Sequence, residues 1–245
     1  MKRASAITAL LAALGGCGAH GDLMSKERLD KGMVVLLPGI EGAIANVYGI
    51  QDGLARGGWE GALPIQTWGW PIPVAGMFLN QTDAAGNRAA GKRLAQTIMD
   101  YQDSHPGAPV YIVGHSGGGG VAVFAAEALE DGHSVDGLVL LSASISAGYD
   151  LSTALARCRK GIVNFYSTRD EILPATSAVG TVDGRLASSA GLNGFSGSYG
   201  RLYQVGWHSG MQRHGNYGGH MDTANSGFVA EYVAPWVTAP MWPAR

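Results

Sequence analysis

Cysteine is scarce in this sequence: of 245 residues, only Cys17 and Cys158 are cysteines. Two cysteines cannot build the framework of bridges that stabilises small secreted proteins, and no C-x-x-C pair is present for zinc or redox chemistry. The histidines do not pair with an acid at the i, i+4 spacing typical of metal ligands, so we expect no metal and no cofactor. Cys158 follows a predicted short helix, and we expect a buried or half-buried thiol without a chemical role.

Charge is also scarce. Charged residues make up only 15% of the chain, and the formal net charge is −2. This balance does not favour nucleic acid or an anionic membrane surface as a partner. Glycine is abundant, with 38 residues, but six Trp, nine Tyr and 46% apolar residues indicate a packed globule rather than a disordered chain. The length suits one domain with a large core.

The N-terminal segment differs from the rest. A basic "MKR" precedes the apolar "ASAITALLAAL", which is too short for a permanent membrane helix and predicts an export signal over residues 1–16. The "LGGC" that ends at Cys17 resembles the bacterial lipobox, with an ordinary secretory signal as the alternative. The resemblance implies lipidation of Cys17 and, because Gly18 follows, anchoring to the outer membrane of the cell envelope. We expect a polar tether over residues 17–32 and a single domain over 33–245.

Strands alternate with helices from residue 33 onward. Apolar runs predict six strands, within residues 33–39, 62–68, 109–116, 135–144, 161–168 and 200–207. Helical spacing predicts helices over 45–57, 87–104, 120–132, 151–157 and 224–238, whereas 175–200 is Gly/Ser-rich and expected to be irregular. Solid apolar strands that alternate with helices predict an α/β fold with a mostly parallel sheet. Ligands of such sheets bind at the carboxyl ends of the strands.

The glycine-rich segment "GHSGGGG" separates the third strand from the helix that follows it. Its first five residues, 114–118, have the form G-x-S-x-G with Ser116 at the centre. In a nucleophile elbow the serine holds a strained backbone conformation, and small neighbours let the strand turn sharply into the helix. A phosphate-binding turn would need G-x-G-x-x-G or a Lys-Ser/Thr ending, and neither is present. The segment therefore predicts a nucleophilic serine.

A nucleophilic serine needs a base and an acid to orient that base. Asp170 lies in the first turn after the fifth predicted strand and is the preferred acid. Asp150, which follows the fourth strand, and the adjacent Glu171 are the alternatives. An aspartate after a strand is also often only a helix cap.

The order of elbow, acid and histidine resembles the α/β-hydrolase superfamily over residues 33–238. The resemblance implies a single-domain α/β-hydrolase fold and a catalytic histidine before the last helix. His220 in "GGHM" matches best, His214 is the second choice, and His208 is expected to be structural or to line a pocket. His115, inside the elbow, is expected to support the site rather than act as the base.

The same resemblance implies an oxyanion hole made by the amides of Gly117 and Ile40, the latter in "LPGIEG". The alternative for this segment is a plain turn that ends a strand. Too few residues separate the fourth and fifth strands for a helical lid domain. We expect the site to be roofed only by residues 175–200 and by the apolar loop 68–78.

These features predict a serine hydrolase that cleaves carboxylic esters, esterase- or lipase-like, through an acyl-enzyme. The expected partners are a small-molecule or lipid ester and the membrane that holds the Cys17 anchor, with no nucleic acid. A thioesterase, amidase or peptidase that uses the same triad is one alternative. A lipid-anchored binding protein that has lost catalysis is the other.

Overall fold

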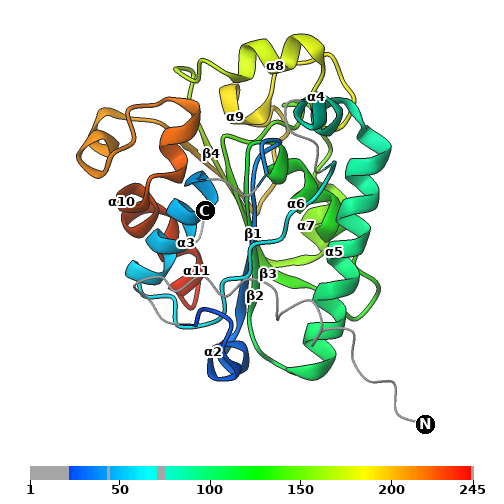
Figure 1. Cartoon of the computed structure of the whole chain (residues 1–245), viewed down its shortest axis with the longest axis vertical. Helices are drawn as coiled ribbons and strands as arrows, with labels where there is room; N and C mark the ends of the chain where they lie inside the picture. The colour runs from blue at the N-terminus through cyan, green and yellow to red at the C-terminus, as the bar shows by residue number, and fades with distance from the viewer. Residues whose placement is uncertain (1–21, 43–44, 71–74, 244–245) are drawn as a thin grey trace.

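A parallel five-stranded sheet with helices on both faces forms the centre of the molecule (Figure 1). The computed structural model describes residues 22–42, 45–70 and 75–243. The strands lie side by side in the order of the sequence, and every pair is parallel. They are β1 (Met33–Leu37), β2 (Val110–His115), β3 (Val135–Leu141), β4 (Cys158–Tyr166) and β5 (Leu202–Gly206). The α/β fold class predicted from the sequence is confirmed.

Strands β1 to β4 are largely buried on both faces because helices cover both sides of the sheet, and successive side chains of a strand point to opposite sides. In β1, Val35 and Leu37 join the core on one side of the sheet. Val34 and Leu36 join the core on the other side. Such double burial explains why the strands are continuous apolar runs.

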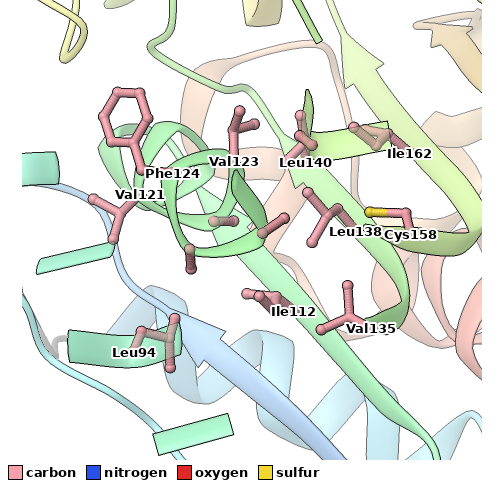
Figure 2. Packing of buried hydrophobic residues seen from close by; sticks show 14 of the residues in the cluster. Leu94, Ile112, Val121, Val123, Phe124, Val135, Leu138, Leu140, Cys158 and Ile162 are labelled. Atoms are coloured by element: carbon pink, nitrogen blue, oxygen red, sulfur yellow. The ribbon is translucent and has the colours of Figure 1, made fainter. Parts of the chain in front are cut away.

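The helices divide between these two cores. Helices α5 (Ala84–Ser104) and α6 (Gly117–Glu127) pack together on one face, where Figure 2 shows Val121 and Phe124 of α6 with strand residues such as Ile112 and Leu138. Helix α3 (Ala45–Arg56) and the C-terminal helices cover the other face. The remaining helices are α2 (Lys26–Lys31), α4 (Ala75–Thr82), α7 (Ser152–Ala156), α8 (Leu173–Val179), α9 (Ala190–Asn193), η2 (Ser209–His214), η3 (His220–Ala224), α10 (Ser226–Phe228), η4 (Val229–Val233) and α11 (Ala234–Thr238).

The prediction of a sixth strand over residues 62–68 is wrong. This segment runs along the outer edge of β1, but only Ala62 and Ile65 form isolated parallel bridges to it. Three backbone hydrogen bonds join the two, with the amides of Val34 and Leu36 donating to the carbonyls of Ala62 and Pro64. The proline between the two bridges has no N–H to donate, so a continuous ladder cannot form.

Three other segments differ from their prediction. Residues 175–200 are not wholly irregular, because α8 extends to Val179 and α9 lies further along. The second half of the predicted loop 68–78 belongs to α4, whereas residues 71–74 lie outside the described part. The closing segment is not one helix but α10, the π-helix η4 and α11 in succession. Pro235 lacks the N–H that an uninterrupted helix would need at that point.

The structure describes residues 22–32 of the predicted polar tether, and these residues include helix α2. Ser25 caps α2, and its side chain accepts a hydrogen bond from the amide of Arg28. The carbonyl of Leu29 accepts a hydrogen bond from the Tyr101 hydroxyl, and the amide of Leu63 donates to the carbonyl of Leu23. Residues 22–32 are therefore docked on the domain. The predicted signal, 1–16, and Cys17 lie outside the described residues.

Cys158 is buried, as predicted, although it begins β4 rather than ending a helix. Its burial raises the pKa of the thiol to about 12, so the thiolate that reacts with oxidants or metals is not formed near neutral pH. Among the described helices, none combines the length and the apolar character that crossing a membrane requires.

Candidate active site

Ser116 occupies the turn between β2 and α6, at the carboxyl end of the strand. Its backbone has φ 52° and ψ −122°, a left-handed conformation that is costly for a residue with a side chain. Three backbone hydrogen bonds hold it: its amide donates to Leu141, and its carbonyl accepts from Gly119 and Ser144, at 2.9–3.0 Å. The turn is the sharp strand-to-helix connection that the sequence predicted.

Glycine is required around this serine because backbone atoms approach closely from two directions. A Cβ on Gly114 would lie 2.4 Å from the carbonyl oxygen of Gly118. A Cβ on Gly118 would lie 2.4 Å from the carbonyl oxygen of Pro38, at the end of β1. Neither distance is possible for a real side chain, so the glycines allow α6 to start directly against the ends of the central strands.

Asp170 and His220 are brought together from positions 50 residues apart. The His220 Nδ1 lies 2.7 Å from the Asp170 Oδ2, and both side chains are buried. The other oxygen, Oδ1, accepts hydrogen bonds from the amides of Ile172 and Leu173 at 3.0 and 2.9 Å. Because a carboxylate accepts, the Nδ1 of His220 carries the proton and its Nε2 is left as the basic nitrogen.

The two alternative acids lie elsewhere. Asp150 is exposed, accepts hydrogen bonds from Ser152 and from the hydroxyl of Tyr199, and has a lowered pKa because of them. Glu171 is exposed too, and its carboxylate lies against the backbone of Gly219. Neither acid makes the bond to the His220 ring that Asp170 makes.

The two alternative histidines lie beside an aromatic residue rather than beside Asp170. The rings of His208 and His214 lie 5.9 and 5.6 Å from that of Tyr232. Tyr232 in turn stacks on Phe228. The structure therefore gives both histidines packing contacts on the C-terminal helices.

His115 supports the loop that carries His220. Its Nε2 lies 3.1 Å from the carbonyl oxygen of His220 and donates to it, and the two rings lie 5.0 Å apart. Burial, with a smaller contribution from the neighbouring His220, lowers the pKa of the His115 imidazole to about 3. His115 is therefore neutral at physiological pH and cannot serve as the base.

Sequence analysis missed three residues around this loop. The Ser142 Oγ lies 3.1 Å from the Thr223 Oγ1, which in turn donates to the His220 carbonyl at 3.3 Å. Ser142 also has a positive φ, 47°, directly after β3. Glu41 is the third: its Oε1 lies 3.9 Å from the His115 Nδ1. Neither of these two atoms has a hydrogen-bond partner among the described residues. Ser142 directly follows an apolar strand, and this position was the signal that could have found it, whereas Glu41 and Thr223 carried no such signal.

The loop after β1 brings Ile40 against the start of α6. A Cβ on Gly117 would lie 2.8 Å from the Ile40 Cγ2, so the two residues expected to form the oxyanion hole are in contact. The loop is fixed by the Asn80 Nδ2, which donates to the Ile40 carbonyl at 3.0 Å, and by the Trp68 Nε1, which donates to the Pro38 carbonyl at 2.8 Å. Among described groups, no acceptor is seen for the amides of Ile40 and Gly117.

A cavity of about 350 Å³ lies between α4 and α8, next to this loop. Figure 1 shows α4, α8 and α9 together at one end of the sheet. Apolar side chains, among them Ile40, Ile172 and Val179, form most of the cavity wall, and Gln81 and Glu171 supply polar atoms. Within the described ranges, no three His, Cys, Asp or Glu side chains gather closely enough to hold a metal ion.

Comparison of the sequence with protein-family models and with curated proteins finds no match. Solved structures do match. A pyrethroid hydrolase from Sphingobium faniae JZ-2 has a TM-score of 0.51 and 15% identity, over 85% of this chain and 98% of that one. A lipase-esterase related protein from Clostridium acetobutylicum ATCC 824 has a TM-score of 0.50 and 9% identity, over 84% and 96%. At these identities the likeness establishes the fold, which is that of the α/β-hydrolases.

Proposed function

We propose that this protein is a serine hydrolase that cleaves carboxylic esters through an acyl-enzyme. The observation that carries the proposal is the 2.7 Å bond between His220 and Asp170 at the same sheet edge as the strained Ser116. A strained serine at a strand–helix turn and a buried histidine–carboxylate pair are the components that nucleophilic catalysis requires. The fold shared with a pyrethroid hydrolase and a lipase-esterase related protein is consistent with it.

In the acylation step the Ser116 Oγ attacks the ester carbonyl carbon, and its proton passes to the His220 Nε2. Asp170 stabilises the imidazolium and keeps the ring in the required tautomer. The carbonyl oxygen gains negative charge, and the amides of Gly117 and Ile40 are the donors available to bind it. When the carbon–oxygen bond breaks, His220 returns the proton to the departing alcohol.

In the deacylation step a water molecule takes the place of the alcohol. His220 removes a proton from the water as it attacks the acyl carbon, and the serine leaves with that proton. The Asp170 carboxylate accepts hydrogen bonds from two amides as well as from His220, so it does not have to reorient between the steps. Preorganised groups of this kind lower the barrier without a cost at the moment of reaction.

The proposal is tested with a fluorophosphonate probe and a panel of p-nitrophenyl esters of graded acyl length. The wild type should be labelled at Ser116 and hydrolyse at least one ester, and Ser116→Ala should abolish labelling and lower kcat by a factor on the order of 10⁶. Ser104→Ala, an exposed serine at the end of α5, is the matched control. A wild type that is not labelled and cleaves no ester would favour a binding protein with this fold.

The same panel separates ester cleavage from the alternatives. A thioester or an amide places the same acyl group on Ser116 and differs only in the atom that leaves. Matched ester, thioester and amide substrates with one acyl group give three values of kcat/KM. We expect the ester to have the largest value relative to its uncatalysed rate, and a larger value for the thioester or amide would reassign the reaction class.

A further inference from the structure

The cavity between α4 and α8 is lined by residues that adjoin two parts of the candidate site. Ile40 in its wall contacts Gly117, the residue after the nucleophile. Glu171 and Ile172 in its wall directly follow Asp170. A group bound in this cavity would therefore lie close to the candidate site, beside Ile40 and the residues that follow Asp170.

Glu171 places a carboxylate on this cavity. A Cβ on Gly219 would lie 3.2 Å from the Glu171 Oε2, so the carboxylate lies against the residue that precedes His220. The nearest cation in the sequence, Arg169, has its guanidinium over the ring of Trp207 at 4.5 Å. Within the described ranges, the ion pairs of the protein do not include Glu171. The cavity therefore carries a negative charge that has no internal counter-ion.

Gln81 contributes a second unsatisfied acceptor. It lines the cavity, is only 2% exposed, and its Nε2 donates to the Gly180 carbonyl at 2.6 Å and to the Ser144 Oγ at 3.0 Å. A backbone carbonyl can only accept, so these bonds fix the orientation of the amide. The Oε1 of Gln81 then has no donor among the described residues. A buried acceptor without a donor is unfavourable. This oxygen is shielded from solvent, so a donor in the cavity would reach it only after the Gln81 side chain moves.

We propose that this cavity binds a positively charged, hydrogen-bond-donating group of the substrate, such as a primary ammonium on an alkyl chain. The proposal rests on the ester hydrolase function and specifies its substrate class. The ammonium would neutralise Glu171 and donate N–H groups to its carboxylate oxygens. The alkyl chain that joins it to the ester would lie against the apolar side chains of Ile40, Ile172 and Val179.

A binding measurement tests the cavity without catalysis. Hexylammonium chloride and 1-hexanol are titrated into Ser116→Ala, with the shifts of amide resonances as the readout. We expect hexylammonium to bind about three- to tenfold more tightly than hexanol, and Glu171→Gln in the same background to remove that difference. Glu231→Gln, an exposed acid on η4, should leave the difference unchanged. Equal affinities, no binding of either compound, or a difference that survives Glu171→Gln would overturn the proposal.

A kinetic measurement separates the proposal from the function on which it rests. The ratio of kcat/KM for p-nitrophenyl 6-aminohexanoate to that for the isosteric heptanoate should exceed one in the wild type and fall about three- to tenfold in Glu171→Gln. A similar fall for the isosteric pair hexyl acetate and 5-aminopentyl acetate would place the ammonium on the alcohol side. If both pairs are cleaved without preference, the substrate class is wrong and the function stands. If hexylammonium binds as expected but no ester is cleaved, the function is wrong and the cation site stands.

Discussion

Ser116 and Ser142 are the non-glycine residues with positive φ in the part of the chain that the structure describes. Strained residues of this kind cost on the order of 1–3 kcal/mol each and persist only where the surroundings hold them in place. Ser116 begins α6, whereas Ser142 is linked through Thr223 to the carbonyl of His220. Both strained residues therefore hold parts of the proposed triad.

The first residue-scale prediction separates the two candidate acids. Asp170→Asn should lower kcat by a factor on the order of 10⁴, because an amide in place of the carboxylate leaves the His220 ring in the wrong tautomer. The kcat of Asp150→Asn should stay close to that of the wild type, because Asp150 is exposed and, among the described contacts, hydrogen-bonds only with Ser152 and Tyr199. Steady-state kinetics on the best ester measures both. If Asp150→Asn were the crippling change, the acid would have been assigned wrongly.

The second residue-scale prediction concerns pH and His115. In the native state this imidazole has a pKa of about 3, below its ordinary value of 6.5. Between those values the unfolded chain binds more protons than the folded chain, so the free energy of unfolding falls as the pH is lowered from about 6.5 toward 3. This one group contributes a slope of at most about 1.4 kcal/mol per pH unit.

Urea unfolding at several pH values between 7 and 4 checks this dependence, with His115→Gln as the comparison. Glutamine keeps an N–H donor for the His220 carbonyl but does not titrate. Its free energy of unfolding should therefore fall less steeply with decreasing pH than that of the wild type. Parallel curves for the two proteins would show that His115 is not the group that titrates.

At the scale of elements, the contact between α6 and the end of β1 yields a third prediction. Gly118→Ala should lower the free energy of unfolding by at least about 2 kcal/mol and reduce ester cleavage, although alanine favours a helix. A Cβ there would lie 2.4 and 2.5 Å from the carbonyl oxygens of Pro38 and Leu37. Denaturant unfolding measures the loss.

Gly200→Ala is the matched control for that substitution. A Cβ on Gly200 meets no atom within 4 Å, and its φ is not positive. Its free energy of unfolding should stay within about 0.5 kcal/mol of the wild type. A Gly118→Ala protein as stable as Gly200→Ala would mean that α6 can move away from the sheet.

The elements that could be predicted from the sequence are those whose local pattern and tertiary role agree. The central strands are continuous apolar runs because both faces are buried, and α3 lies within a residue of its predicted limits. The edge segment at residues 62–68 carries the same apolar signal, but Pro64 interrupts it with a residue that has no N–H, so its pairing with β1 is limited to isolated bridges. The short helices α8 and α9 were not predicted, because the Gly/Ser-rich composition of this segment indicates a loop and does not show helical turns that depend on tertiary contacts.

The candidate site likewise contains some residues that the sequence indicates and others that it does not. The glycines around Ser116 indicate its turn in the sequence, and Asp170 follows a predicted strand, whereas His220 was chosen from the resemblance to the α/β-hydrolases. Glu41 and Gln81 gave no such signal, because the burial that leaves their oxygens without donors comes from segments distant in the chain. The sequence can therefore indicate functional residues that directly follow a strand. It cannot indicate polar residues whose role depends on burial by distant segments of the chain.

At the scale of the whole molecule, we propose that Cys17 carries a lipid that holds the protein at the cell envelope. Two or three acyl chains bind far more firmly than one, since each buried CH₂ adds about 0.8 kcal/mol. Cys17→Ser should therefore move the protein from the membrane fraction to the soluble fraction without a change in kcat/KM. Cell fractionation and mass spectrometry of the N-terminus measure this. A wild-type protein found in the cytosol with Met1 intact would contradict the proposal.

Cys158 yields a second prediction at this scale, measured in a Cys17→Ser protein so that one thiol remains. This thiol is 1% exposed and lies in the core on the α6 side of the sheet (Figure 2). With a pKa raised to about 12, it should not react with Ellman's reagent in the native state at pH 8. Reaction should follow urea unfolding with the same midpoint as the circular dichroism signal. Rapid modification of the native protein would mean that this core opens locally.

The docking of α2 on the domain sets how far the proposed enzyme can travel from its anchor. Because Leu23 already bonds to Leu63, only five residues, 18–22, would separate this fixed point from a lipidated Cys17. A fully extended chain of that length spans only about 20 Å. With the proposed lipid on Cys17, so short a connection would confine the proposed enzyme to a thin layer above the lipid headgroups and raise its effective concentration toward molecules in or on that surface. Substrates that diffuse freely beyond that layer would have to come to the membrane to be cleaved.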